Sequence, residues 1–336
     1  MRITISDIAR EVGVSTTTVS RYLNKNYDYM SYETRQRIEQ VIEKYNYVPS
    51  NAARILKSKH SKNIGVVVNT LRYQVAAQTL TGINEICAGN GYSTVIYTTD
   101  DDPEKESKAL QKCINQQVDG IVLIPCQNIV QPYLNITNYG IPIVMCTRRF
   151  EAWPYSSVSV KHDEIINNMV LHLVEQGFEK VQFLLDEPNF HKRWMADIFA
   201  DLAKKYFNMS PCDSVVFVGR QNPNIGENID AFLSKYQTNH KAIMAVNTQT
   251  LFLLLKEIEK RKLVMPNDVG ICGYDALGWS ELVYPGITIM RQPMKETGRK
   301  AGEELVRCLK LNTLGDRKIR LAGENFYRGS TRLKGV

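Results

Sequence analysis

The chain has 336 residues, of which 43% are hydrophobic, and a formal net charge of +7. It is longer than one usual compact domain, and no run of about 18 apolar residues predicts a membrane-spanning helix. We expect no signal peptide, and seven scattered cysteines without a Cys-x-x-Cys pair exclude a disulfide or zinc framework and indicate a cytosolic protein.

The positive charge is concentrated near the N-terminus. Residues 1–62 contain 11 Lys and Arg against 6 Asp and Glu, a net of +5, which leaves +2 for the rest of the chain. This asymmetry indicates that the N-terminal segment binds a polyanion, although a solvated basic surface explains the charge equally well.

The first 48 residues predict three helices. Ser6 is placed to cap the first, which Gly13 ends, and Ser15 is placed to cap the second. The third runs from about 31 to 45, before Pro49. The apolar residues expected on the inner faces are Ile8, Ala9, Val12, Val19, Tyr22, Leu23, Ile38, Val41 and Ile42. Two short helices joined by a tight turn with glycine predict a helix-turn-helix, which places its second helix in the DNA major groove.

The second helix carries side chains suited to reading DNA. Thr16, Thr17 and Thr18 are weak helix formers, but their hydroxyl and methyl groups reach base edges or phosphates without bulk. Arg21, about one turn further on, reaches a guanine or a phosphate. The alternative is an ordinary helical hairpin with a polar face, which the spacing alone leaves open.

From Asn63 the pattern changes to short buried strands that alternate with helices. Strands are expected at 63–69, 92–98, 120–125 and 141–146, and then near 180–185, 214–218, 241–246 and 268–273. Such alternation predicts parallel sheets covered by helices on both faces, and two series of this kind predict two doubly wound subdomains.

Motifs in both parts of the chain resemble the LacI/GalR family of bacterial transcription regulators. The stretches "ITISDIAREVGVSTTTVSRYLN" and "YVPSNAARILKSK" carry the resemblance near the N-terminus, and "GICGYD", "GITIMRQP" and "GRKAGEELV" carry it later. The resemblance implies an α-helical headpiece followed by an α/β core of two periplasmic-binding-protein-like subdomains, between which the chain crosses three times. It also implies a homodimer or a dimer of dimers, and the absence of a leucine-heptad tail favours the dimer. The expected boundaries are 1–48 for the helix-turn-helix domain, 49–62 for a hinge helix and linker, 63–160 with 291–316 for the first subdomain, and 161–290 with 317–336 for the second.

By this resemblance, residues of the headpiece and hinge contact double-stranded DNA. The expected contacts are Ser6, Ser15, Thr16, Thr17, Arg21, Asn24, Asn51, Ala53, Arg54 and Leu56. The hinge helix orders when two copies meet on the minor groove of a pseudo-palindromic operator. Leu56 matches the family's wedge, an apolar side chain that kinks DNA between base steps, and the alternative is a leucine that packs on its own domain.

An effector is expected beyond the carboxyl ends of the strands, where doubly wound sheets bind ligands. The side chains assigned to it are Tyr73, Arg149, Lys161, Arg193, Asn247 and Asp275. The resemblance implies that Arg193 grips the effector and that Asp275 accepts hydrogen bonds from sugar hydroxyls. Because cations outnumber carboxylates at these strand ends, we expect an acidic sugar of the uronate or 2-keto-3-deoxygluconate type. The alternative is that the cations pair with neighbouring side chains.

No catalytic motif accompanies these features. The chain lacks Gly-x-Ser-x-Gly, Gly-x-Gly-x-x-Gly and Walker-type loops, and its five histidines lack metal-ligand spacing. We therefore expect no catalytic residue, no metal and no cofactor. The sequence predicts a cytoplasmic, nucleoid-associated repressor of carbohydrate-utilisation genes that a small sugar or sugar acid releases from its operator, and it leaves open whether the effector instead acts as a corepressor. A sugar-converting enzyme with a fused DNA-binding head is the alternative, and a ligand-free architectural DNA binder is a third.

Overall fold

The computed structural model describes residues 3–47, 60–148, 150–219, 224–275 and 278–333. The chain forms two compact units, residues 1–61 and 62–336. No helix in the described ranges is both long and apolar enough to cross a membrane.

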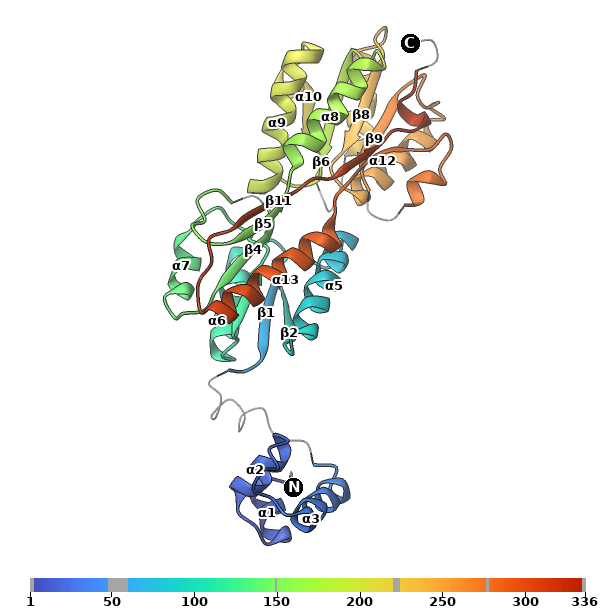
Figure 1. Ribbon diagram of the computed structural model, residues 1–336. Helices are drawn as coiled ribbons and strands as arrows, with labels where there is room; N and C mark the ends of the chain where they lie inside the picture. Colours follow the sequence, from blue (N-terminus) through green and yellow to red (C-terminus); the bar gives the residue numbers. More distant parts are fainter. Residues whose placement is uncertain (1–2, 48–59, 149, 220–223, 276–277, 334–336) are drawn as a thin grey trace. The chain divides into compact units, whose positions relative to one another are not determined.

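The first unit consists of the three expected helices (Figure 1). They are α1 (Ile5–Val12), α2 (Thr16–Leu23) and α3 (Tyr32–Lys44). Their core contains the fully buried side chains of Ile8, Val12, Val19 and Ile38, with Tyr22, Leu23, Val41 and Ile42 packed against them. The 3.6-residue spacing of these apolar residues is what gives each helix one inward face.

Capping bonds set the boundaries of the first two helices. The cap of α1 is Thr4, not Ser6: its hydroxyl accepts the backbone N–H of Asp7, and the Asp7 carboxylate accepts the backbone N–H of Thr4. Ser6 instead lies exposed in the first turn. Gly13 ends α1 in the left-handed region, with φ +76°, and Ser15 caps α2 as expected.

The first sheet of the second unit is parallel throughout, with the strand order β11-β5-β4-β3-β1-β2. Its strands are β1 (Asn63–Val68), β2 (Ser93–Thr98), β3 (Gly120–Leu123), β4 (Ile143–Thr147), β5 (Ser157–Val160) and β11 (Lys318–Leu321). One face packs on α5 (Gln74–Gly89) and α13 (Met294–Leu311), which lie along each other in Figure 1, and the other packs on α6 (Pro103–Asn115) and α7 (Gln131–Thr137).

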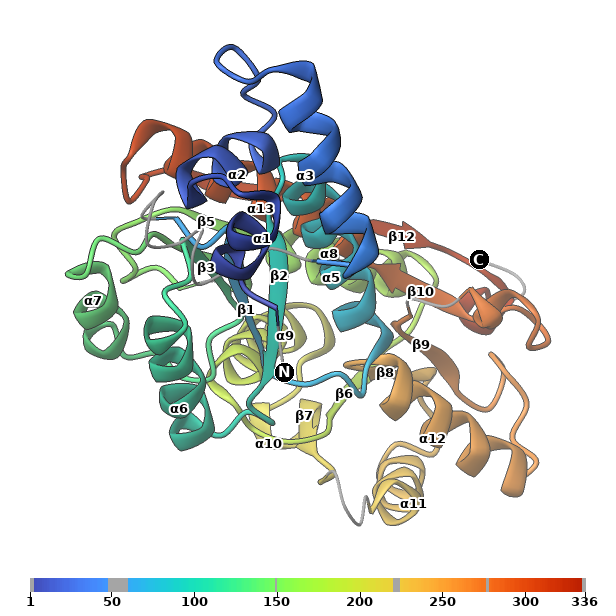
Figure 2. The same cartoon turned by 90° about the horizontal axis from the view of Figure 1, so that it is seen from below.

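The second sheet has the strand order β12-β10-β9-β8-β6-β7, and only β12 is antiparallel to its neighbour. Its strands are β6 (Lys180–Leu185), β7 (Val215–Phe217), β8 (Lys241–Ala245), β9 (Gly270–Tyr274), β10 (Thr288–Arg291) and β12 (Glu324–Phe326). The accompanying helices are α8 (His162–Glu175), α9 (Phe190–Phe207), α10 (Pro211–Ser214), α11 (Ile225–Lys235) and α12 (Thr248–Lys260), with short 3-10 turns at Trp279–Glu281 and Gly329–Thr331. Helix α8 packs beside α9, and Figure 2 shows α11 beside α12.

The chain crosses between the two sheets after β5, after β10 and after β11. The first two crossings lie at or next to the expected boundaries, but the third comes later than expected. Residues 317–336 do not all belong to the second subdomain, because β11 pairs with β5 in the first sheet, with Ile319 opposite Val158. β11 and β12 are short edge strands only two residues apart, and their local pattern does not say which sheet each one joins.

Candidate functional site

The side chains of α2 that are predicted to read DNA lie on the surface of the first unit. Thr16, Thr17 and Arg21 are exposed, whereas Val19 between them is fully buried. Thr17 and Arg21 are four residues apart and therefore share one helix face. The guanidinium of Arg21 lies over the ring of Tyr29, 5.6 Å from its centroid. This face therefore presents hydroxyl groups beside a positive charge.

The other predicted DNA contacts divide into two groups. Ser6, Ser15 and Asn24 are exposed, and the Asn24 amide donates a hydrogen bond of 2.7 Å to the carbonyl of Ser20. Asn51, Ala53, Arg54 and Leu56 lie outside the described residues, so their assignment stays a prediction.

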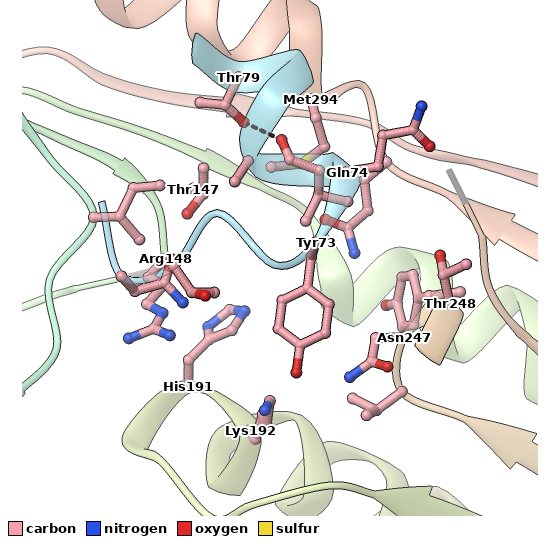
Figure 3. A pocket seen from close by; sticks show the side chains of 18 of the residues that line it. Tyr73, Gln74, Thr79, Thr147, Arg148, His191, Lys192, Asn247, Thr248 and Met294 are labelled. Atoms are coloured by element: carbon pink, nitrogen blue, oxygen red, sulfur yellow. Dashed lines mark hydrogen bonds between the residues drawn. The ribbon is translucent and has the colours of Figure 1, made fainter. Parts of the chain in front are cut away.

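A cavity of about 320 Å³ lies at the carboxyl ends of both sheets of the second unit (Figure 3). The first subdomain lines it with polar residues that follow β1, β2 and β4, and the second with residues that follow β8 and β9 or begin α8 and α9. The polar lining residues include Asn69, Arg72, Tyr73, Gln74, Asp101, Thr147, Arg148, His162, His191, Lys192, Asn247, Thr248, Asp275 and Gln292. A ligand in this cavity would touch both subdomains.

Asp186, which follows β6, joins the two subdomains beside the cavity. The residue is only 5% exposed, and it forms an ion pair with Lys192. The hydroxyl of Tyr73, from the first subdomain, donates to Oδ2 of Asp186 at 3.0 Å, and Nδ2 of Asn247 donates to the same oxygen at 3.1 Å. Burial raises the pKa of Asp186, but the charge and hydrogen bond of Lys192 outweigh it and hold the pKa below its ordinary value.

A second ion pair lies in the first subdomain. Nη2 of Arg148 is 2.6 Å from Oδ1 of Asp101, and both side chains are nearly buried. The guanidinium also donates to the carbonyl of Pro125 at 2.6 Å. Asn189 of the second subdomain reaches Asp101 with a long hydrogen bond of 3.5 Å, and the Phe190 ring lies 5.6 Å from the Arg148 guanidinium. The subdomains therefore also touch at this side of the cavity.

The carboxylate of Asp275, after β9, is fixed by its own subdomain. It is 3% exposed, and its Oδ2 accepts the backbone N–H of Gly278 at 3.1 Å and the hydroxyl of Ser280 at 3.0 Å. The hydroxyl of Thr248 lies 3.4 Å from Oδ1. These bonds orient the carboxylate before any ligand arrives, which reduces the entropy that binding must overcome.

Two histidines lie in the same wall. Nδ1 of His162 is 3.0 Å from the hydroxyl of Tyr274, and the rings of His162 and His191 are 5.0 Å apart. Burial lowers the pKa of His162 to about 4. Burial, and then the neighbouring His162, Arg148 and Lys192, hold the pKa of His191 well below its ordinary value. Both rings are therefore neutral at pH 7.

The structure brings only part of the predicted effector set together. Tyr73, Asn247 and Asp275 line the cavity, and Arg149 lies outside the described residues. Lys161 does not line it; its ammonium pairs with Glu164 at 2.8 Å.

Arg193 is exposed and also lies outside the cavity lining, whereas the preceding Lys192 belongs to it, so a contact between Arg193 and the effector stays a prediction. One residue along a helix rotates the side chain by about 100°. The signal was present in the sequence, since Lys192 stands three and seven residues before the buried Met195 and Phe199 and therefore shares their face.

Buried histidines make the second unit sensitive to acid. Burial, and to a lesser extent the charge of Arg332, lower the pKa of His172 from 6.5 to about 4. Between these values the unfolded chain binds a proton that the folded chain excludes. We therefore expect the free energy of unfolding to fall by about 1.4 kcal/mol per pH unit for such a histidine as the pH drops from 6.5.

Urea unfolding followed by tryptophan fluorescence at pH 7, 6 and 5 measures this slope, since Trp153, Trp194 and Trp279 all lie in the second unit. His172→Gln should reduce the slope by nearly one proton, and the exposed His240, changed to Gln, serves as the control. Equal slopes for His172→Gln and the unchanged chain would contradict the expectation.

Comparisons with known proteins match both units. Residues 4–50 match the family "Bacterial regulatory proteins, lacI family", and residues 170–331 match "Periplasmic binding protein-like domain". The chain is 29% identical over 336 residues to the HTH-type transcriptional regulator KdgR of Bacillus subtilis (strain 168), with 97% of each chain covered. It is 26% identical over 316 residues to the probable HTH-type transcriptional regulator EndR of Paenibacillus polymyxa, with 90% of this chain and 89% of that one covered.

The fold also matches a solved structure. The crystal structure of the Lac repressor dimer bound to operator and the anti-inducer ONPF aligns with a TM-score of 0.78 at 20% identity, covering 99% of this chain and 100% of that one. At this identity the likeness establishes the fold alone: a helical N-terminal unit followed by two parallel-sheet subdomains.

Proposed function

Since the chain belongs to the LacI family of bacterial regulatory proteins, we propose that it represses carbohydrate-utilisation genes and leaves its operator when a sugar acid binds in the cavity. The main support for the proposal is the cavity, because its polar groups come from both subdomains. The same chain presents Thr17 and Arg21 on an exposed face of α2. The relatives are named as transcriptional regulators, and the chain is likewise a DNA-binding regulator and not an enzyme. We further propose that it acts in the cytoplasm, at the nucleoid, as a homodimer on a pseudo-palindromic operator.

The operator-reading role is assigned to the exposed face of α2. Thr17 and Arg21 read base edges, while Ser6, Ser15, Thr16 and Asn24 position the unit on the phosphates. Asn51, Ala53, Arg54 and Leu56 are proposed to contact the minor groove, on the strength of the family pattern.

Arg21→Ala should weaken operator binding by about 1–3 kcal/mol and relax the preference at one base pair, because a bidentate contact to guanine is lost. Fluorescence anisotropy with the operator and its single-base variants, at one fixed salt concentration, measures both effects. The exposed Lys25, which follows α2, is the matched control: Lys25→Ala should weaken operator and random DNA alike. An unchanged base preference in Arg21→Ala would contradict the placing of α2 in the groove.

The chemistry of the effector follows from the charges that line the cavity. Arg148 and Lys192 are already paired with Asp101 and Asp186, which removes two of the cations counted from the sequence. Arg72 also lines the cavity, is exposed, and forms no ion pair within the described ranges. We assign the carboxylate of a sugar acid to Arg72, since guanidinium suits bidentate capture of a carboxylate.

The remaining polar groups suit a carbohydrate. The fixed carboxylate of Asp275 and the amide of Asn247 are assigned to sugar hydroxyls, and the Tyr73 ring offers a flat surface to the sugar. The similarity to KdgR is in keeping with a regulator of sugar-acid metabolism.

Release of labelled operator from the full chain tests the proposal. 2-keto-3-deoxygluconate, D-galacturonate and D-gluconate are compared with D-glucose and D-galactose, with and without Arg72→Gln. Release by at least one acid, with a loss of that response in Arg72→Gln, is the expected result. Release by the neutral hexoses alone would overturn the acidic effector but keep the regulator, and release by none would overturn the effector half of the proposal.

A further inference from the structure

One histidine of the cavity wall has a buried nitrogen without a hydrogen-bond partner. Nδ1 of His191 is out of contact with solvent, and no donor or acceptor of the described structure bonds to it. Burying a polar atom without a partner is unfavourable, so most buried side-chain polar atoms in folded proteins are paired. An exception in the wall of a cavity points to a partner that arrives from outside the chain.

The neighbouring His162 differs from His191 in that its Nδ1 has a hydrogen-bond partner. Nδ1 of His162 is paired with the hydroxyl of Tyr274 at 3.0 Å, within the same wall. The ring of His191 packs against two aromatic rings, 5.0 Å from the His162 ring and 5.5 Å from the ring of Trp194, and no hydrogen bond within the described ranges holds it. Packing therefore fixes where the His191 ring lies while its nitrogen stays unsatisfied.

The place of His191 is suited to contacting a ligand. It stands in the first turn of α9 and lines the cavity, and Figure 3 shows it near Tyr73 and Arg148. Because its pKa is held well below the ordinary value by burial and by nearby cations, the ring is neutral at pH 7. A neutral imidazole has one donor and one acceptor nitrogen, and a hydroxyl group can pair with either one.

We infer that His191 is a specificity-determining residue of the effector cavity, where its Nδ1 forms a hydrogen bond with a hydroxyl group of the effector. The inference rests on the proposed function, because it needs a polyhydroxylated ligand between the subdomains. It adds a residue beyond those that hold the carboxylate and the other hydroxyls. In the ligand-free protein Nδ1 of His191 lacks a hydrogen-bond partner among the described residues, and ligand binding supplies one.

Three variants of the full chain test this assignment. His191→Phe keeps an aromatic ring against Trp194 and His162 but removes the nitrogen. His191→Asn places an amide close to the position of Nδ1. His162→Phe is the matched control, since it removes a nitrogen that is already paired and leaves the hydroxyl of Tyr274 without that partner.

The measurements are the melting temperature without ligand and the affinity for 2-keto-3-deoxygluconate and D-galacturonate by titration calorimetry. His191→Phe should keep or raise the melting temperature and lose about tenfold in affinity, the size of one hydrogen bond. His191→Asn should recover most of that affinity. His162→Phe should instead lower the melting temperature.

The outcomes distinguish the role of His191 from the proposed binding of a sugar acid in the cavity. Equal affinity of His191→Phe and the unchanged chain would overturn the role of His191 while keeping the cavity as the effector site. A lower melting temperature of His191→Phe without ligand would mean that the nitrogen is structural, which also overturns the inference. Failure of the unchanged chain to bind either sugar acid would remove the proposed acidic effector and this inference with it.

Discussion

Asp186→Ala should lower the free energy of unfolding of the second unit by about 3–5 kcal/mol. The carboxylate is nearly buried and faces the ammonium of Lys192, whose side chain is itself only 13% exposed. Removing one member of a buried ion pair leaves the other charge desolvated without that partner, which is among the costliest single changes in a folded protein. Tyr73 and Asn247 lose the same acceptor, so two further polar groups lose a hydrogen bond.

Urea unfolding followed by tryptophan fluorescence measures this loss. Combining Asp186→Leu with Lys192→Met should recover most of the stability, because an apolar pair of similar volume needs no charged partner. The pair of Asp213 and Lys235, whose side chains are 30% and 54% exposed, provides the control: Asp213→Ala should cost less than about 1 kcal/mol. A cost for Asp186→Ala as small as that for Asp213→Ala would show that Lys192 is solvated once its partner is gone.

The network around Asp186 also shows why charge counting along the sequence misjudged the cavity. Lys192 and Arg148 follow strand ends and raise the count of cations, as expected from the sequence. Asp101, the partner of Arg148, follows β2 and comes within an ion-pair distance of Arg148 only in the folded sheet. Asp186, the partner of Lys192, follows the same strand as Lys192, six residues before it, and the first turn of α9 brings the two side chains together. Local sequence therefore predicts which side chains gather at a sheet edge, but not which of them neutralise one another.

The architecture was largely predictable, since alternating buried strands and amphipathic helices leave few solutions other than two doubly wound sheets. Two predictions were wrong, the cap of α1 and the position of the third crossing, because each depends on a second residue or strand that the local pattern does not identify. Thr4 and Ser6 are both hydroxyl residues suited to a helix cap, and it is Asp7, three residues after Thr4, that completes a capping box and selects Thr4. The third crossing was misplaced because the pairing of an edge strand depends on a partner distant in sequence, here β5.

Asp275→Ala should give a protein that still binds its operator but needs about 100-fold more effector, or more, for release. Hydrogen bonds to a charged group contribute about 1.5–3 kcal/mol each, so a carboxylate that receives two sugar hydroxyls supplies about 3–6 kcal/mol. Moving a two-state equilibrium from mostly bound to mostly released needs a difference of about 5.5 kcal/mol in ligand affinity between the two states. The loss of Asp275 therefore removes much of the free energy that drives the switch, whichever sugar acid the cavity takes.

The readout is the concentration of 2-keto-3-deoxygluconate or D-galacturonate that releases half of the labelled operator. Operator affinity without effector should stay within about threefold of the unchanged chain, because Asp275 lies in the second unit, outside the segments assigned to DNA. Asp275→Asn keeps the shape of the side chain and loses its charge, so it should fall between Ala and the unchanged chain, as expected when charge-assisted bonds become neutral ones. If Asp275→Ala abolishes operator binding, the bonds to Gly278 and Ser280 make this residue structural. If Asp275→Ala releases DNA at the same effector concentration as the unchanged chain, the effector does not bind this carboxylate. The contacts that favour the released state must then come from other residues of the cavity.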